Sequence, residues 1–166
     1  IRADGRIVTV AGTGEGGFAG DGGVASQAKL NKPHEIRFDA AGDLYIADMA
    51  NHSIRKVELK TGVIKTVAGT GFGGYVGDGD MATVAHLKQP SGMQFAPDGS
   101  LYICDTGNHV VRRLDLKTGV ISHVAGTGKP GVTPDGAPLD GTPIAAPRAI
   151  DFDRDGNPWV VLRDSH

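Results

Sequence analysis

Apolar and polar residues alternate in short runs along this chain, and the same run occurs three times. The apolar positions are two residues apart in each copy: Ile36 and Phe38, Met93 and Phe95, Ile150 and Phe152. A two-residue period predicts a β-strand with one buried face. The segments LYIAD, LYICD and PWVVL come next in the three copies. Their aromatic and β-branched residues predict a second strand.

Two further strands are predicted in each of the first two copies. After an Asn-His turn come SIRKVEL or VVRRLDL, then Thr-Gly, then VIKTVAG or VISHVAG. Four short antiparallel strands separated by turns are typical of a propeller blade. The sequence therefore predicts an all-β fold of four-stranded antiparallel blades.

The copies form a tandem repeat with a constant period of 57 positions. Pro33, Pro90 and Pro147 lie at this interval, and 30 of 57 positions are identical between 7–63 and 64–120. A regular repeat of this size predicts a solenoid, a propeller or an array. The predicted segments are a last strand with its linker (1–32), blade 1 (33–69), a linker (70–89), blade 2 (90–126), a linker (127–146) and a partial blade 3 (147–166).

Each linker is about twenty residues long, which is unusual inside a compact repeat. Ala25, Ala28 and Leu30 recur at the end of the second linker, and they predict a loop packed by its own side chains. The third linker carries four prolines and is predicted to be irregular.

Composition narrows the function classes. The chain has 166 residues, of which 39% are hydrophobic and 22% charged, as in ordinary globular domains. A formal net charge of −2 provides no basic stripe, which argues against nucleic acid as a partner. No run approaches the 18 apolar residues of a membrane span. The single cysteine, Cys104, excludes an internal disulfide and is expected to be a small buried strand residue.

Several motifs together carry a family resemblance. They are Asp-x-x-Asn-His after a Tyr-Ile strand, the proline that opens each first strand, and the VAGTG and GDG segments of the linkers. With these motifs the chain resembles NHL repeats of the longer bacterial subtype. The resemblance implies a β-propeller, most often of six blades. It also implies a secreted or periplasmic location, since many bacterial proteins of this subtype are exported.

The two ends of the sequence correspond to complementary parts of one blade. Ile1 aligns with Glu58 and His166 with His52, so Ile7 to Val10 is expected to be the fourth strand of a preceding blade. The absence of an initiator Met suggests a processed protein or an excised piece. Propellers usually have four to eight blades. We therefore expect either a C2 homodimer forming a six-bladed ring, with each N-terminal strand completing the partner's last blade, or the missing half of a longer chain.

Two glycine-rich motifs are weak candidates for ligand sites. The GxGxxG letters of Gly12 to Gly17 lack the following helix that a dinucleotide site requires, so a turn is expected there. Asp78 and Asp80 offer two hard oxygen ligands, but calcium takes six to eight. Asp before Gly is also a common turn pair, which is the favoured interpretation.

The residues Asp48, Asn51 and His52 recur as Asp105, Asn108 and His109. A catalytic function would not usually need the same set in each blade. We predict that these side chains bond turn backbone groups and fasten the second strand to the third.

The copies differ at the residues after the opening proline, which are expected at the mouth of the central channel. They are His34 and Glu35, then Ser91 and Gly92, then Arg148 and Ala149. A histidine beside a carboxylate can bind a metal or act as a base, and an arginine can hold an anion. Pro33-His34 is similar to the strand openings of peptidyl-hydroxyglycine amidating lyases and streptogramin B lyases. That resemblance implies an active-site role for His34.

Two functions follow as hypotheses. The favoured one is a binding scaffold with no certain cofactor, whose protein or small-molecule ligand contacts Ser91 and Arg148. The alternative is a metal-dependent lyase or lactone hydrolase at the channel mouth. In it, His34 would bind a divalent ion such as Ca²⁺ or Zn²⁺, with Glu35 as ligand or base and Arg148 as anion clamp.

Overall fold

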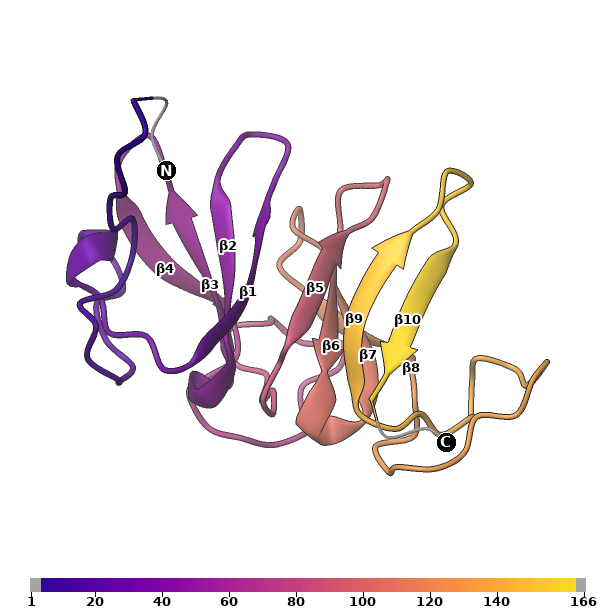
Figure 1. Cartoon of the computed structure of the whole chain (residues 1–166). Helices are drawn as coiled ribbons and strands as arrows, with labels where there is room; N and C mark the ends of the chain where they lie inside the picture. The colour runs from indigo at the N-terminus through magenta and orange to yellow at the C-terminus, as the bar shows by residue number, and fades with distance from the viewer. Residues whose placement is uncertain (1–3, 164–166) are drawn as a thin grey trace.

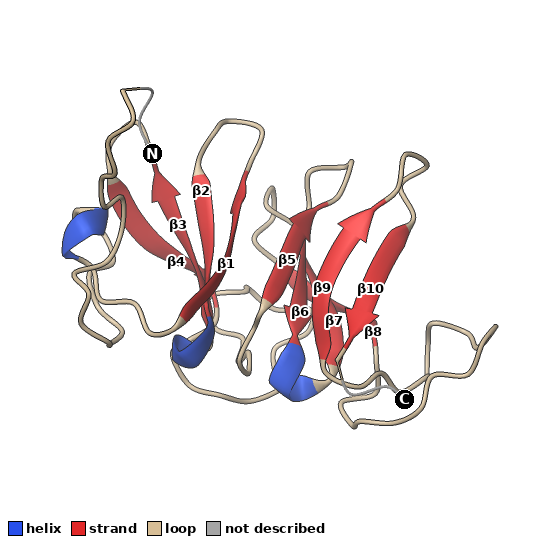
Figure 2. Cartoon of the chain, in the orientation of Figure 1, coloured by secondary structure: helices blue, strands red, loops and turns tan. Residues whose placement is uncertain are grey.

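The structure is a computed structural model that describes residues 4–163, and in this range it is built of β-strands and short 3-10 helices (Figures 1 and 2). The strands are β1 (Pro33–Phe38), β2 (Leu44–Asp48), β3 (Ser53–Glu58), β4 (Val63–Ala68), β5 (Gly92–Phe95), β6 (Leu101–Asp105), β7 (Val110–Leu114), β8 (Ile121–Ala125), β9 (Pro147–Phe152) and β10 (Pro158–Leu162). The 3-10 helices are Ala25–Gln27, Met49–Asn51 and Thr106–Asn108.

The strands form three separate antiparallel sheets. Their orders are β1-β2-β3-β4, β5-β6-β7-β8 and β9-β10, so each strand pairs with its neighbour in sequence. This meander is the predicted blade, and it is confirmed for both complete copies. The first strands lie against one another, because β1 contacts β5 and β5 contacts β9 (Figure 1). The three sheets are therefore consecutive blades of a β-propeller.

The main apolar core lies in the seam between blades 1 and 2. Blade 1 contributes Tyr45, Ala47 and Ile54, while blade 2 contributes Met93 and Ile103 among others. Alternate side chains of one strand face opposite sides of the sheet, so each blade packs on both of its neighbours. The seam between blades 2 and 3 repeats this arrangement with Cys104, Val111 and Ile150.

The linkers belong to this core, as predicted. Ala25, Ala28 and Leu30 pack against blade 1, and their counterparts Ala82, Ala85 and Leu87 are buried in the seam between blades 1 and 2. The residues after Gly12 form no helix before Ala25, which confirms the turn interpretation of the glycine motif. The linkers are thus packed against the blades through buried side chains.

Cys104 is fully buried in β6, as expected. Burial and the neighbouring carboxylates of Glu35 and Asp105 raise the pKa of its thiol to about 12. Such a thiol stays protonated and is inert at neutral pH.

One expected strand is not formed within this chain. Ile7 to Val10 belong to no strand, and the Ile7 side chain is 84% exposed, whereas its counterparts Ile64 and Ile121 are fully buried. The reason is pairing: Ile64 and Ile121 lie in strands hydrogen-bonded to β3 and β7, and residues 4–163 offer no such partner to Ile7. The predicted contributions of Ile1 and His166 lie outside the described residues. In residues 4–163 no helix is both long and apolar enough to cross a membrane.

Candidate functional site

The repeated Asp-x-x-Asn turn binds three parts of the fold together. The Asp48 side chain is fully buried at the end of β2. It accepts hydrogen bonds from the Asn31 amide (2.7 Å), from Asn51 Nδ2 (2.8 Å) and from Arg55 Nη1 (3.2 Å). Asn51 Nδ2 also donates to the Gly17 carbonyl at 2.6 Å. The predicted fastening of the second strand to the third is confirmed, and it extends to the preceding linker.

Blade 2 repeats this network around Asp105. Asn108 Nδ2 lies 2.8 Å from Asp105 Oδ2, and the Lys88 amide donates to Asp105 Oδ1 at 2.7 Å. Burial raises the pKa of Asp105, against these hydrogen bonds and the nearby Arg112 guanidinium. Buried carboxylates that accept several hydrogen bonds hold the backbone around them in one conformation.

Two buried arginines, which sequence reasoning missed, complete these networks. The side chains of Arg55 and Arg112 are fully buried. Arg55 pairs with Asp21 at 2.6 Å, and Arg112 pairs with Asp78 at 2.8 Å. The available signal was the presence of Arg at the same place in both third strands, together with an Asp that recurs in both linkers.

The ion pair of Asp78 favours the turn interpretation of Asp78 and Asp80 over a calcium site. The Asp78 carboxylate accepts hydrogen bonds from Arg112, so it is committed to an ion pair. Among residues 4–163, no three His, Cys, Asp or Glu side chains are placed to hold one metal ion. The Gly-Asp-Gly segment therefore anchors the linker to its blade.

The histidines of the repeated turns are also structural. His52 Nδ1 accepts a hydrogen bond from the Gln89 amide at 3.0 Å, and His109 Nδ1 accepts one from the Ala146 amide at 3.0 Å. His52 and Gln89 both have left-handed backbones, with φ of 52° and 50°. Non-glycine residues rarely adopt this conformation, so the hydrogen bond stabilises a strained junction between two blades.

The residues after the opening prolines come together at one rim of the blades. His34 Nδ1 lies 2.8 Å from the Ser91 carbonyl, and Ser91 Oγ donates to the Arg148 carbonyl at 3.2 Å. Arg148 Nη2 lies 3.3 Å from His34 Nε2. His34 and Ser91 are one full repeat apart in sequence, as are Ser91 and Arg148, and the Arg148–His34 contact spans two repeats.

This geometry determines the tautomer of His34. A carbonyl oxygen only accepts hydrogen bonds, so His34 Nδ1 carries the proton that is donated to Ser91. Nε2 is then the acceptor toward Arg148. The backbone fixes the ring orientation and leaves a nitrogen lone pair directed at the arginine, a form of histidine that can bind a cation or accept a proton.

Glu35 does not join this group. Its Oε2 accepts a hydrogen bond from the Met93 amide at 2.8 Å, and its other oxygen forms an ion pair with Arg37. The carboxylate therefore lies in the seam between β1 and β5. The structure brings together His34, Ser91 and Arg148, and it places Glu35 in a separate ion pair.

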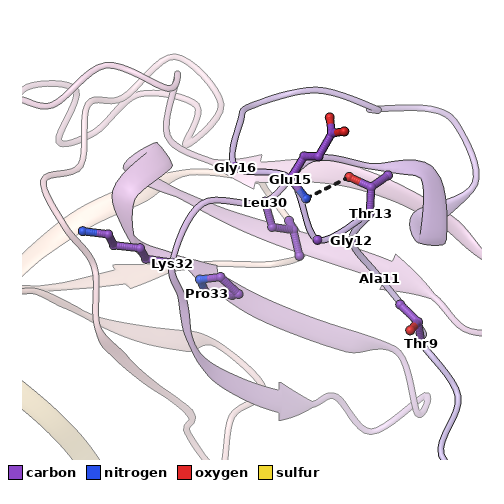
Figure 3. Close-up of a pocket in the computed structure, with 10 residues that line it drawn as sticks. Thr9, Ala11, Gly12, Thr13, Glu15, Gly16, Leu30, Lys32 and Pro33 are labelled. Atoms are coloured by element: carbon purple, nitrogen blue, oxygen red, sulfur yellow. Dashed lines mark hydrogen bonds between the residues drawn. The ribbon is translucent and has the colours of Figure 1, made fainter.

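A cavity of about 480 Å³ lies between the start of the first linker and the residues that lead into β1 (Figure 3). Its lining includes Gly12, Thr13, Leu30 and Pro33. The counterpart of Gly12 is Gly69, which follows β4 and packs directly against the His52–Ser53 backbone of its own blade, blade 1. The cavity thus lies where a preceding blade would place its turn.

Comparison with known proteins agrees with the repeat pattern. Residues 5–74 match the family described as the teneurin NHL domain. NHL repeat-containing protein 2 of Bos taurus is 34% identical over 128 residues, which are 76% of this chain and 18% of that protein. The protein SUPPRESSOR OF QUENCHING 1, chloroplastic, of Arabidopsis thaliana is 32% identical over 117 residues, 70% of this chain and 11% of that protein. The chain thus spans less than a fifth of either relative.

A solved Bacteroides thetaiotaomicron protein of unknown function has the same fold. It superposes with a TM-score of 0.70 at 27% identity, over 84% of this chain and 35% of its own. The matched blades, the matching family and the repeated Asp-x-x-Asn-His turns agree with one another. The chain is therefore built of repeats similar to those of NHL-repeat proteins, and it forms part of a β-propeller.

Proposed function

We propose that this chain is a rigid binding scaffold whose ligand contacts His34, Ser91 and Arg148 at the channel mouth. One observation carries this proposal. The polar residues common to the blades are engaged in holding strands and linkers, whereas the rim residues differ from blade to blade. In repeat proteins a constant framework presents variable exposed positions to a partner. The exposed Arg148 guanidinium suits a carboxylate or phosphate ligand.

We further propose that two copies associate head to tail into a six-bladed ring. Such a ring has C2 symmetry and would gather two sets of His34, Ser91 and Arg148 around one channel. The solution mass tests the assembly. Light scattering is expected to give twice the chain mass of 17.2 kDa. A folded β protein of 17.2 kDa at every concentration would rule out the ring of two copies.

A metal-dependent lyase or lactone hydrolase is the second candidate. The observation that favours it is the His34 tautomer, since Nδ1 is held by the Ser91 carbonyl and Nε2, which here accepts from Arg148, carries the lone pair that a metal would need. Metal-binding histidines are usually oriented in this way by a carbonyl or carboxylate on the other nitrogen. Arg148, beside this nitrogen, would then hold an anionic substrate.

One set of measurements on the His34 ring separates the two candidates. For the scaffold, titration with citrate is expected to shift the His34 ring resonances with saturation, and Arg148→Ser is expected to abolish the shift. Arg154→Ser removes an exposed arginine of the β9–β10 turn and should leave the shift intact. A stoichiometric divalent ion in the purified protein, lost in His34→Ala, would instead establish the metal site and contradict the scaffold.

A further inference from the structure

An aromatic pair closes each seam between neighbouring blades. Tyr45 of β2 meets Phe95 of β5 edge-on at 5.1 Å between ring centroids, and Tyr102 of β6 meets Phe152 of β9 at 5.0 Å. In both pairs the second strand of one blade contributes the tyrosine, and the first strand of the next contributes the phenylalanine. Such edge-to-face pairs add stability beyond the area they bury.

The two outer blades carry the unpaired halves of a third aromatic pair. Trp159 of β10 has the repeat position of Tyr45 and Tyr102, and Phe38 of β1 has that of Phe95 and Phe152. Trp159 is 67% exposed and Phe38 is 56% exposed. The aromatic contact made twice inside the chain is thus available once more between its two outer faces.

The apolar neighbours of these aromatics show the same contrast. Ile36 of β1 is 52% exposed, although its counterparts Met93 and Ile150 are almost fully buried. Val161 of β10 is 59% exposed. Its counterparts Ala47 and Cys104 are fully buried in the seams that contain Met93 and Ile150. A pair of Val161 and Ile36 would therefore reproduce contacts that both internal seams already make.

The charges of the two outer faces are complementary. Gln94 of β5 donates to Asp151 of β9 at 2.9 Å, and these residues hold the same repeat position. The third residue at this position is Arg37 of β1. If β9 of one copy packed against β1 of a second copy, Asp151 would therefore lie beside Arg37 of that second copy. Opposite charges at matched positions favour this register and disfavour others.

We infer that the β1 face of one copy, formed by Ile36, Arg37 and Phe38, docks on the β9–β10 face of a second copy, formed by Asp151, Trp159 and Val161. The inference rests on the proposed ring of two copies and names its interface. The two faces match each other in apolar contacts, aromatic pairing and charge, so a second copy satisfies both. Two such contacts close the ring, and each places Arg148 of one copy next in the series to His34 of the other.

Charge reversal tests this interface, because the contact is made between two different faces. Arg37→Asp sets two carboxylates against each other in both contacts of the homodimer, and Asp151→Arg sets two guanidinium groups against each other. Each variant alone is expected to dimerise at least about tenfold more weakly than the wild type. Mixed in equal amounts, the two variants pair acid with base in both contacts and so are expected to recover a species of twice 17.2 kDa. Lys117→Asp, in an exposed turn, is the control and should leave dimerisation unchanged.

The recovery in the mixture depends on how the charges distribute over the two contacts. In a dimer of one copy of each variant, one contact joins the two introduced charges, which are opposite, and the other joins the two native charges, which are also opposite. Neither homodimer has such a contact. A mixture that remains monomeric would therefore overturn the interface.

Trp159 is the single tryptophan of the chain and reports on the same face. Its emission is expected to shift to shorter wavelength as the protein concentration rises through the dimerisation range. A wild-type dimer that is insensitive to both charge variants and shows no concentration-dependent Trp159 burial would overturn this interface while leaving the ring intact. A wild-type protein that is monomeric throughout would overturn the ring and the interface together.

Discussion

Replacing Arg112 with methionine is expected to lower the free energy of unfolding by about 3–5 kcal/mol. The Arg112 side chain is fully buried, lies 3.9 Å from the Asp105 carboxylate, and donates to the carbonyls of His86 and Val76. Its removal leaves the buried Asp105 carboxylate without a neighbouring cation and the two carbonyls without their donor, and a buried charge without a counter-charge costs far more than an exposed one. Urea denaturation followed by circular dichroism measures the loss.

The neighbouring residue provides a matched control. Arg113 also lies on β7 and pairs with Asp98 at 3.0 Å, but both side chains are partly exposed. Ion pairs at the surface contribute little to stability. Arg113→Met is therefore expected to leave the urea midpoint almost unchanged. Equal losses of stability in Arg112→Met and Arg113→Met would show that the buried arginine contributes no more than the exposed one.

The loss in Arg112→Met is also expected to depend on pH. Burial raises the pKa of Asp105 in the folded protein to about 7 with Arg112 present, and removal of the guanidinium raises it further. A carboxyl with a raised folded pKa contributes stability below its unfolded pKa and loses it as the pH rises through the folded value. The difference in free energy of unfolding between the variant and the wild type should therefore increase from acidic to mildly alkaline pH.

Gly69→Ala is expected to produce a second large loss, about 3 kcal/mol or more. Gly69 has a left-handed backbone (φ 89°), and an added Cβ would overlap the His52 carbonyl oxygen and lie 2.8 Å from Ser53 Cα. The methyl group therefore meets the backbone of the neighbouring turn, whose His52 also accepts a hydrogen bond from the Gln89 amide through Nδ1.

Gly42→Ala measures how much of this stability loss comes from the left-handed backbone alone, without the clash. Gly42 has a similar φ of 86°, and an added Cβ there would have no neighbour within 4 Å. Only the left-handed conformation is penalised, at about 1–2 kcal/mol. In thermal denaturation, the melting temperature of Gly69→Ala should be well below that of Gly42→Ala. Similar melting temperatures would show that the turn adapts to the methyl group.

The fold was largely predictable from sequence because each pattern occurs more than once. A single alternation such as Ile36 and Phe38 is a weak signal, but its recurrence one repeat later at Met93 and Phe95 is a strong one. The strand expected at Ile7 to Val10 is not formed within this chain, for a physical reason. Strand propensity forms no strand without a hydrogen-bonded neighbour, and the described residues provide none there.

The candidate site was predictable only in part. Comparing the copies identified His34, Ser91 and Arg148, because positions that differ between blades stand out against an otherwise repeated framework. Their hydrogen bonds depend on backbone carbonyls of neighbouring blades, which have no sequence signature. Arg55 and Arg112 were missed because arginine is usually exposed, and their burial depends on linker carboxylates 34 positions away.

Each linker is bonded to the blade that follows it. Asp21 pairs with Arg55, and the Gly17 carbonyl accepts a hydrogen bond from Asn51. The ion pairs and the turn networks therefore lie within one unit, formed by a linker and the blade that follows it. A gene duplication with breakpoints just after the fourth strand would copy this unit whole. The new blade would meet its neighbours through seams that the chain already contains. In such a lineage the number of blades can change by one duplication event, without a new type of contact having to evolve.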